Sequence, residues 1–188
     1  MKQNIKRPIA LVTGVSREIG IGASIALSLG ESGWDVATTY WRPYDAAMPW
    51  GSDDAHAEKI LGKIREFSPR AVSIEADLSD TSSPTRIFDT VADSIGPVSA
   101  LVMAHCQSVD SDIETTTVES FDLHFAVNAR ATWLLIREFR RRYQGERGRG
   151  RIISITSDHT AYNMPYGASK GAMDRIVLAA AQEFKDLG

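Results

Sequence analysis

The segment 9–33 constrains the fold of this chain more than any other part of the sequence. Its first four residues are apolar and are typical of a short buried strand. The apolar residues of 20–32 repeat with helical spacing and predict a helix. Gly14, Gly20 and Gly22 lie between the two elements. This order of strand, glycine turn and helix is the context that a dinucleotide-binding loop requires.

Each glycine of this loop has a predicted role in binding a pyrophosphate. Gly14 permits the tight turn, Gly20 lets the backbone approach the phosphates, and Gly22 allows the helix to pack closely on the strand. The start of the helix presents unpaired N–H groups and a partial positive charge to the phosphates. The candidate cofactor contacts in the loop are Gly14, Ser16, Arg17, Gly20, Ile21 and Gly22.

The rest of the chain alternates strands and helices. Strands are expected near 8–13, 35–41, 71–76, 98–104 and 150–156, and helices near 20–32, 54–67, 83–95, 117–142 and 164–187. The strands are short apolar runs, as expected when helices cover both faces of a sheet. We therefore predict an α/β fold with a doubly wound parallel sheet, in one domain that spans 1–188.

Tyr166 and Lys170 place a phenol and an ammonium four residues apart. On a helix these positions share one face, so both groups can reach a single substrate carbonyl. A lysine charge about 5 Å from the phenol, at an effective dielectric of about 20, is worth about 3 kcal/mol. We therefore expect Lys170 to lower the pKa of Tyr166 by about 2, which would suit acid–base catalysis near neutral pH.

Together, the glycine loop and the Tyr-x-x-x-Lys pair resemble the short-chain dehydrogenase/reductase family. The family's fingerprints are Thr-Gly-x-x-x-Gly-x-Gly near the start and Tyr-x-x-x-Lys later, and the resemblance covers essentially the whole chain. It implies a Rossmann-type sheet and a structural and catalytic role for Asn128. It also implies that Asp77 and Leu78 lie at the adenine end of the cofactor.

The resemblance implies a mechanism of carbonyl–alcohol interconversion with a nicotinamide cofactor, with 3-oxoacyl thioester reduction as one comparison. Tyr166 would act as the general acid or base, and Lys170 and Asn128 would bind cofactor and resupply protons. A serine that ends the fifth strand would orient the substrate carbonyl. Ser157 is our choice for that serine, with Ser154 and Thr156 as the alternatives.

The choice of cofactor rests on the residues after the second strand. An acidic side chain there favours NAD, whereas an arginine favours NADP. Arg42 follows this strand, no acid occurs before Asp45, and Arg17 in the glycine loop is a second cation. We predict that both arginines face a 2′-phosphate, and hence NADP, with NAD as the alternative; Arg42 as a solvated loop residue is the competing interpretation.

Two segments depart from the family pattern or have no assigned role. Met103-Ala104-His105-Cys106 replaces the family's Asn-Asn-Ala-Gly after the fourth strand. We do not expect a metal site there, because adjacent strand residues point to opposite faces, and no base is evident for a Cys106 nucleophile. The segment 43–54 is either a flap near the adenosine half of the site or a variable surface loop.

The composition suits an enzyme that acts on a small molecule. The chain has 188 residues, is 43% hydrophobic, and has a net charge of −3 with a pI near 5.8. This slightly negative charge gives no overall electrostatic attraction to nucleic acid. It has one cysteine, no signal-peptide core and no apolar run of about 18 residues. We expect a cytoplasmic protein that binds neither nucleic acid nor membrane.

Sequence that the family places after the helix near 164–187 does not follow here. We therefore expect that the final strands and the substrate loop are absent, and that these 188 residues bind NADP, turn over substrate poorly and associate as homo-oligomers. The rival hypothesis is a non-catalytic nucleotide-binding or regulatory protein. Turnover of NADPH with a panel of ketones and 3-oxoacyl thioesters would distinguish the two.

Overall fold

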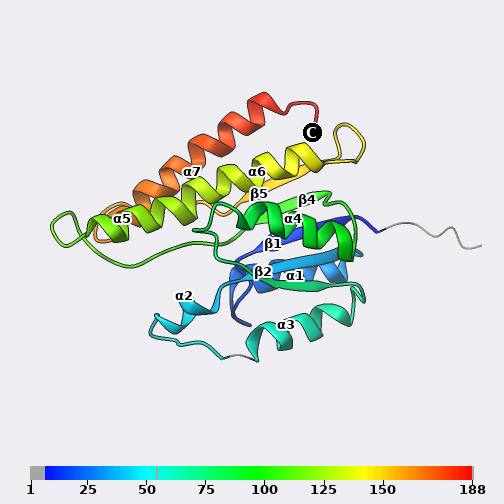
Figure 1. The fold of residues 1–188 in the computed structure, drawn as a ribbon, viewed down its shortest axis with the longest axis horizontal. Helices are drawn as coiled ribbons and strands as arrows, with labels where there is room; N and C mark the ends of the chain where they lie inside the picture. Colours follow the sequence, from blue (N-terminus) through cyan, green and yellow to red (C-terminus); the bar gives the residue numbers. More distant parts are fainter. Residues whose placement is uncertain (1–6, 54, 188) are drawn as a thin grey trace, which may run out of the picture.

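The computed structural model describes residues 7–53 and 55–187 and contains a five-stranded parallel sheet (Figure 1). The strands are β1 (Ile9–Thr13), β2 (Asp35–Tyr40), β3 (Val72–Glu75), β4 (Ala100–Met103) and β5 (Arg151–Ser154). They lie in the order β3-β2-β1-β4-β5, and each neighbouring pair is parallel. The strand order reverses between β1 and β4, which is where an open α/β sheet forms its ligand crevice.

Helices cover both faces of this sheet. In chain order they are α1 (Ile21–Glu31), α2 (Arg42–Ala46), α3 (His56–Arg65), α4 (Ser83–Ser94), α5 (Val118–His124), η1 (Phe125–Arg130), α6 (Ala131–Arg142) and α7 (Met164–Glu183). One face packs on α1 and α3 and the other on α4, α6 and α7. The predicted fold class is confirmed, and every strand lies inside its predicted range.

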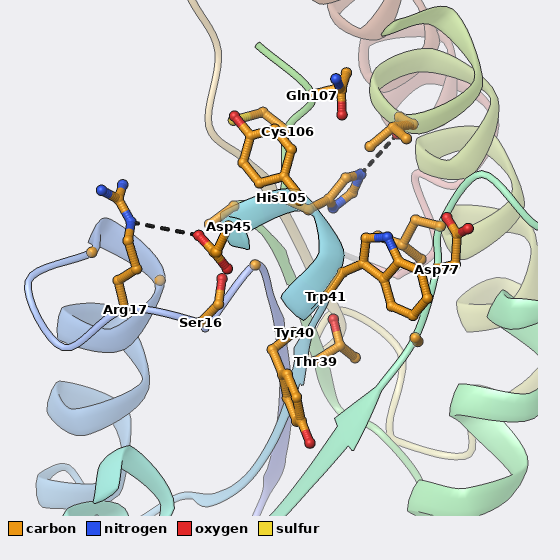
Figure 2. A pocket seen from close by; sticks show the side chains of 18 of the residues that line it. Ser16, Arg17, Thr39, Tyr40, Trp41, Asp45, Asp77, His105, Cys106 and Gln107 are labelled. Atoms are coloured by element: carbon orange, nitrogen blue, oxygen red, sulfur yellow. Dashed lines mark hydrogen bonds and ion pairs between the residues drawn. The ribbon is translucent and has the colours of Figure 1, made fainter. Parts of the chain in front are cut away.

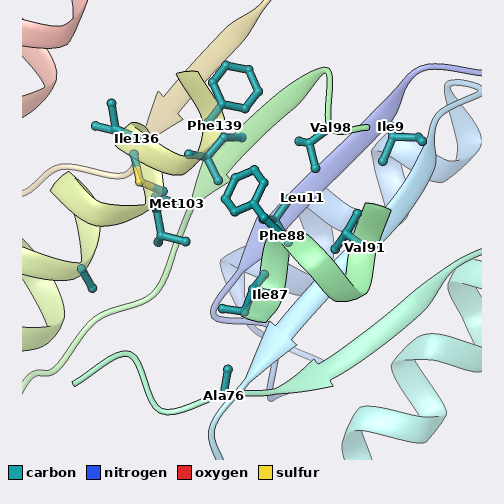
Figure 3. Close-up of a cluster of buried hydrophobic side chains, with 14 of the residues drawn as sticks. Ile9, Leu11, Ala76, Ile87, Phe88, Val91, Val98, Met103, Ile136 and Phe139 are labelled. Atoms are coloured by element: carbon teal, nitrogen blue, oxygen red, sulfur yellow. The ribbon is translucent and has the colours of Figure 1, made fainter. Parts of the chain in front are cut away.

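Alternate residues of the central strands enter different cores. Leu11 of β1 and Leu101 of β4 pack on the face of α4 and α6, with Phe88 and Phe139 (Figure 3). Val12, the neighbour of Leu11, packs on the opposite face with α1 and α3. Because both faces are buried, the central strands β1 and β4 are almost entirely apolar and show no polar alternation. Full burial of one such side chain is worth about 1.5–3 kcal/mol.

Two helical regions differ from the sequence-based predictions. The range 117–142 is not one α-helix: α5 passes into the π-helix η1, which passes into α6. The segment predicted as a flap or loop, of which residues 43–53 are described, begins within the five-residue helix α2 (Arg42–Ala46), which has Pro43 in its first turn. A helix this short has too few residues to show an apolar repeat, so the sequence pattern does not reveal it.

β5 lies at the edge of the sheet in the described part of the chain. Its side chains alternate between exposed and half-buried, and Ile153 is 49% exposed. Of the helices in the described ranges, none has the length and apolar character needed to cross a membrane.

Candidate active site

The glycine loop lies at the carboxyl end of β1 and is packed so tightly that side chains are excluded. Gly14 has a φ of +76°, and a Cβ there would lie 2.6 Å from the backbone N and Cα of His105. A Cβ on Gly22 would lie 2.5 Å from the carbonyl oxygen of Gly14. The tight turn and the close packing of α1 on β1 are therefore built as predicted.

A cavity of about 200 Å³ opens above this loop (Figure 2). Most of the predicted cofactor contacts line it: Gly14, Ser16, Arg17, Gly20, Ile21, Gly22, Asp77 and Leu78. The sequence did not assign the other side chains that line it, which include Trp41, Tyr44, Asp45, His105, Cys106 and Gln107. The cavity therefore lies at the carboxyl ends of β1, β2, β3 and β4, beside the point where the strand order reverses.

The segment after β2 reaches across this cavity. The hydroxyl of Tyr44 donates a hydrogen bond to the carbonyl oxygen of Ser108, 3.3 Å away in the loop after β4. Burial is the main reason that the pKa of Tyr44 is raised to about 12. A second cavity, of about 900 Å³, lies beyond Tyr44 and shares Trp41 and Gln107 with the first. Of the two interpretations of 43–54, the flap agrees with this arrangement.

Arg17 is held by the flap. Its guanidinium lies 4.2 Å from the ring centroid of Trp50, and its Nε lies 4.0 Å from Oδ1 of Asp45. The indole N–H of Trp50 donates to the same carboxylate oxygen at 2.9 Å. Asp45 is 4% exposed, and its Oδ2 has no hydrogen-bond partner among the described residues. An acidic side chain therefore enters the cavity that the sequence expected to be cationic.

Arg42, the second predicted contact of a 2′-phosphate, does not line the main cavity. Its guanidinium binds both carboxylate oxygens of Glu75 on β3, at 2.8 Å and 2.6 Å, and this pairing lowers the pKa of Glu75. It lines a small adjoining cavity with Ser16, Asp45 and His56. The physical reason is that β3 lies next to β2 in the sheet, which brings Glu75 beside Arg42 although 33 residues separate them.

Asn128 lies in the π-helix η1 and is fully buried. Its side-chain oxygen accepts from the N–H of Gln107 at 2.7 Å. Its side-chain nitrogen donates to the carbonyl oxygen of Gln107 and to Oγ of Ser169, both at 2.8 Å. Ser169 in turn donates to the carbonyl oxygen of Tyr166 at 2.8 Å. Asn128 thus connects the loop after β4 with the first turns of α7, and π-helical turns often occur at functional sites.

Tyr166 lies within hydrogen-bond reach of Ser157. Hydrogen bonding to Ser157 lowers the pKa of the phenol, but burial and the nearby Cys106 raise it further, so the net direction is upward. Each candidate hydroxyl also has another partner: Ser157 accepts from the N–H of His159 at 3.2 Å, Ser154 lies against the sulfur of Met173, and Thr156 donates to Asp174. Among the three candidates, Ser157 is the one whose hydroxyl meets Tyr166.

The expectation that Lys170 lowers the pKa of Tyr166 is wrong for this structure. The ammonium of Lys170 donates to the carbonyl oxygen of Ile155 at 2.7 Å and lies 5.8 Å from the centroid of the Tyr166 ring. Lys170 is itself buried, and burial lowers its pKa. The spacing argument considered only the charge of the lysine, whereas burial of the phenol is the larger influence.

A family model described as short chain dehydrogenase matches residues 8–188. The chain belongs to the short-chain dehydrogenase family. Members of this family are oxidoreductases that use NAD or NADP.

Relatives of the chain agree with this assignment. It is 31% identical to an uncharacterized oxidoreductase, YjdA, of Bacillus subtilis, over 96% of this chain and 70% of the relative. It is 33% identical to the versicolorin reductase stcU of Emericella nidulans, over 95% of this chain and 64% of the relative. The NADPH-dependent aldehyde reductase-like protein of Arabidopsis thaliana chloroplasts is 33% identical, over 96% and 68%. The chain therefore spans about two thirds of the length of these relatives.

Solved structures show the same fold. A dehydrogenase/reductase from Sinorhizobium meliloti has a TM-score of 0.78 at 31% identity, over 94% of this chain and 66% of the other. A short chain dehydrogenase from Mycobacterium smegmatis has a TM-score of 0.82 at 17% identity, over 97% and 73%. The second likeness concerns the fold alone.

The glycine loop of this short-chain dehydrogenase differs from the family fingerprint in spacing. Five residues separate Gly14 from Gly20, where the pattern has three. Residues 17–20 form a turn closed by the bond from the N–H of Gly20 to the carbonyl oxygen of Arg17, and Ile19 in that turn is 94% exposed. The added residues therefore project outward and leave the packing of Gly14 and Gly22 intact.

His105 lies in the segment that replaces the family motif. Within 7–53 and 55–187, no three His, Cys, Asp or Glu side chains are placed to hold a metal ion. The imidazole of His105 contacts Thr13 and Val127 instead. Burial raises the pKa of the neighbouring Cys106, so its thiol stays protonated near neutral pH.

Proposed function

We propose that this chain is an NADP(H)-dependent oxidoreductase that interconverts a carbonyl and a secondary alcohol by hydride transfer. The observation that carries the proposal is the position of Tyr166, which lies between Ser157 and Lys170 and close to Cys106 of the cavity wall. The dinucleotide fits the residues present, because the cavity of about 200 Å³ is lined by Gly14, Gly20 and Gly22 and lies at the N-terminus of α1, where unpaired N–H groups can bind phosphate. When bound, the cofactor supplies or accepts the hydride.

The residues of the chain then have distinct tasks. Ser157 orients the carbonyl oxygen of the substrate, and Tyr166 donates the proton to that oxygen during reduction. The raised pKa of Tyr166 keeps the phenol protonated at neutral pH, which suits a proton donor. By resemblance to the family, Lys170 and Asn128 return a proton to Tyr166 from solvent. Alcohol oxidation reverses these steps with Tyr166 as the base.

Replacement of Tyr166 by Phe tests this assignment. We expect the substitution to reduce NADPH-dependent reduction of a ketone or 3-oxoacyl thioester by about 100–10,000-fold, because positioned acid–base catalysis is worth that much. Cofactor affinity should stay almost unchanged. Tyr162→Phe is the matched control, since Tyr162 is 80% exposed and lies four residues earlier. Near-normal turnover in Tyr166→Phe would refute the proposal, and cofactor binding with no turnover in the unaltered protein would favour a non-catalytic nucleotide-binding protein.

The preference for NADP rests on Arg17 and Arg42. Both flank the end of β2, and a charge-assisted hydrogen bond to a 2′-phosphate contributes about 1.5–3 kcal/mol, or roughly tenfold to a hundredfold in affinity. The phosphate must compete with Asp45 for Arg17 and with Glu75 for Arg42. Titration of NADPH and NADH by fluorescence tests this: equal affinities, or no loss of NADPH affinity in Arg17→Ala and Arg42→Ala, would remove the assignment.

We also propose that the chain forms homo-oligomers through α6 and α7. Trp133 of α6 and Leu178 of α7 are large apolar side chains that are about half exposed. Light scattering at two concentrations, with Trp133→Ser as the variant, tests the proposal. A monomer at high concentration would refute it.

A further inference from the structure

We infer that His105 is a positioning residue: its imidazole ties the end of β1 to the π-helical turn of Asn128, and through Asn128 it fixes the first turns of α7. The inference rests on the proposed function for its effect on turnover. The hydrogen bonds that carry it are independent of that function.

His105 is 7% exposed and forms one hydrogen bond with each ring nitrogen. Nε2 lies 3.2 Å from the carbonyl oxygen of Val127, which can only accept, so Nε2 carries the hydrogen. Nδ1 lies 2.7 Å from the hydroxyl of Thr13. Burial, with the charge of Lys170, lowers the pKa of His105 to about 3, so the ring is neutral and Nδ1 accepts from Thr13.

The backbone of His105 is fixed at the same place. Gly14 follows Thr13, and a Cβ on Gly14 would collide with the backbone N and Cα of His105 at 2.6 Å. Side chain and backbone of residue 105 therefore both contact the start of the glycine loop. A shift of this loop cannot occur without a shift of His105.

The connection continues to the catalytic helix through a reciprocal pair of contacts. The side chain of His105 binds the backbone of Val127, and the side chain of the next residue, Asn128, binds the backbone of Gln107 at 2.7 Å and 2.8 Å. Asn128 also donates to Ser169, which donates to the carbonyl oxygen of Tyr166. Two sets of hydrogen bonds therefore connect Thr13 with Tyr166. The first runs from Thr13 through His105 to the carbonyl of Val127, and the second runs from the side chain of Asn128 through Ser169 to Tyr166. The peptide unit between Val127 and Asn128 and the side chain of Asn128 join the two sets covalently.

This path matters because acid–base catalysis depends on the position of the phenol. A misplacement of about 1 Å by a change far from the chemistry can cost about 100-fold in rate. Loss of the bond between His105 and Val127 would leave the carbonyl of Val127 in η1 without this hydrogen bond. The next residue, Asn128, could then shift, and its carboxamide would position Ser169 less precisely. We expect the effect on turnover to come from this bond and not from the bond to Thr13.

Two substitutions separate the two bonds of His105. In His105→Asn, the side-chain oxygen can accept from Thr13 in place of Nδ1, but the shorter side chain cannot reach Val127. In His105→Gln, the side-chain nitrogen can donate to Val127 in place of Nε2. We expect His105→Asn to lower kcat by about 10–100-fold, and His105→Gln to recover most of that loss at a similar melting temperature.

A second measurement needs no turnover and no cofactor. Amide hydrogen exchange in the protein without cofactor should rise in His105→Asn across both η1 and residues 164–170, and should stay near the unaltered level in His105→Gln. Equal kcat and equal exchange in the two variants, or faster exchange confined to β1 and β4, would overturn the inference. If the unaltered protein has no turnover, the proposed function fails, whereas the exchange experiment still decides the role of His105.

Nitrogen NMR of the unaltered protein tests the same inference if His105→Asn does not fold. The ring should be the neutral tautomer with hydrogen on Nε2 between pH 8 and 5. A hydrogen on Nδ1, or protonation near pH 6.5, would contradict the contacts that carry the inference.

Discussion

The two ends of the candidate site are held together by different interactions. At the flap, Arg17 and Arg42 pair with Asp45 and Glu75, and both guanidinium groups are about two fifths exposed. At the catalytic end, buried and mostly uncharged hydrogen bonds connect His105, Asn128 and Ser169. Exposed ion pairs are weak and are screened by salt, whereas an unsatisfied buried polar group is costly. Both side chains of the Arg42–Glu75 pair are partly exposed, so this pair can exchange its partner for a ligand at low cost, whereas the buried hydrogen bonds around Asn128 cannot.

The largest effect on stability should come from Asn128→Leu. The substitution leaves the N–H and carbonyl of Gln107 and the hydroxyl of Ser169 without their partner, at about 1–3 kcal/mol for each buried group. We expect a loss of about 3 kcal/mol or more in the free energy of unfolding, measured by urea denaturation. Gln144→Leu is the control, because that carboxamide is exposed and should change stability by less than about 0.5 kcal/mol. Equal losses in both variants would break the comparison.

Glycine substitutions give the next largest effect. Gly22→Ala places a Cβ 2.5 Å from the carbonyl oxygen of Gly14. We expect this overpacking to lower the free energy of unfolding by about 1–3 kcal/mol and to weaken cofactor binding. Gly62→Ala, in α3, meets no atom within 4 Å and should stabilise the protein by about 0.5–1 kcal/mol. Thermal denaturation measures both changes. A neutral Gly22→Ala would show that α1 can move away from β1 at little cost.

As the pH falls, the protein should lose stability through histidines near Asn128 before the carboxylates of the flap become protonated. Burial lowers the pKa of His105 to about 3 and also lowers that of His124, so both stay neutral in the fold while an unfolded histidine gains a proton near pH 6.5. The unfolded state then binds more protons, and stability present above pH 6.5 is lost as the pH falls, by up to about 1.4 kcal/mol per pH unit for each histidine.

Urea denaturation at pH 7.5, 6 and 5 measures this loss. His105→Gln and His124→Gln should each flatten the slope. A slope between pH 6.5 and 5 that neither buried-histidine variant changes would contradict the prediction.

The smallest effect should come from Glu75→Gln at the flap. Because the pair with Arg42 is partly exposed, we expect a change of less than about 1 kcal/mol in the free energy of unfolding. NADPH affinity should rise a few-fold at low salt, since the phosphate no longer competes with a charged carboxylate, and the gain should fade in high salt. Asp80→Asn, which alters a pair with Arg86 at the start of α4, should leave NADPH affinity unchanged. A loss above about 2 kcal/mol in Glu75→Gln would show that the flap is as rigidly held as the catalytic end.

The sequence predicted those parts of the molecule that depend on neighbours along the chain. The glycine loop, the five strands and the Tyr166–Lys170 pair are encoded by short spacings, which is why linear patterns found them. The partners of Arg42 and Arg17 could not be found in this way, because Glu75 lies on an adjacent strand and Asp45 is brought in by a helix of five residues. The pKa of Tyr166 was predicted in the wrong direction because burial cannot be read from a spacing.

The π-helical turn η1 also changes the register of the helices on either side of it. One added residue rotates everything that follows by about 100° relative to a continuous α-helix. Leu135 and Phe139 of α6 are buried in the core, and Asn128 is buried in the same continuous helical segment that α5, η1 and α6 form. Deletion of a single residue from 125–130 would preserve the lengths of α5 and α6. It would, however, rotate the buried face of α6 relative to the buried face of α5. The wider π-helical turn therefore lets Asn128 and the apolar residues of α6 both face the interior.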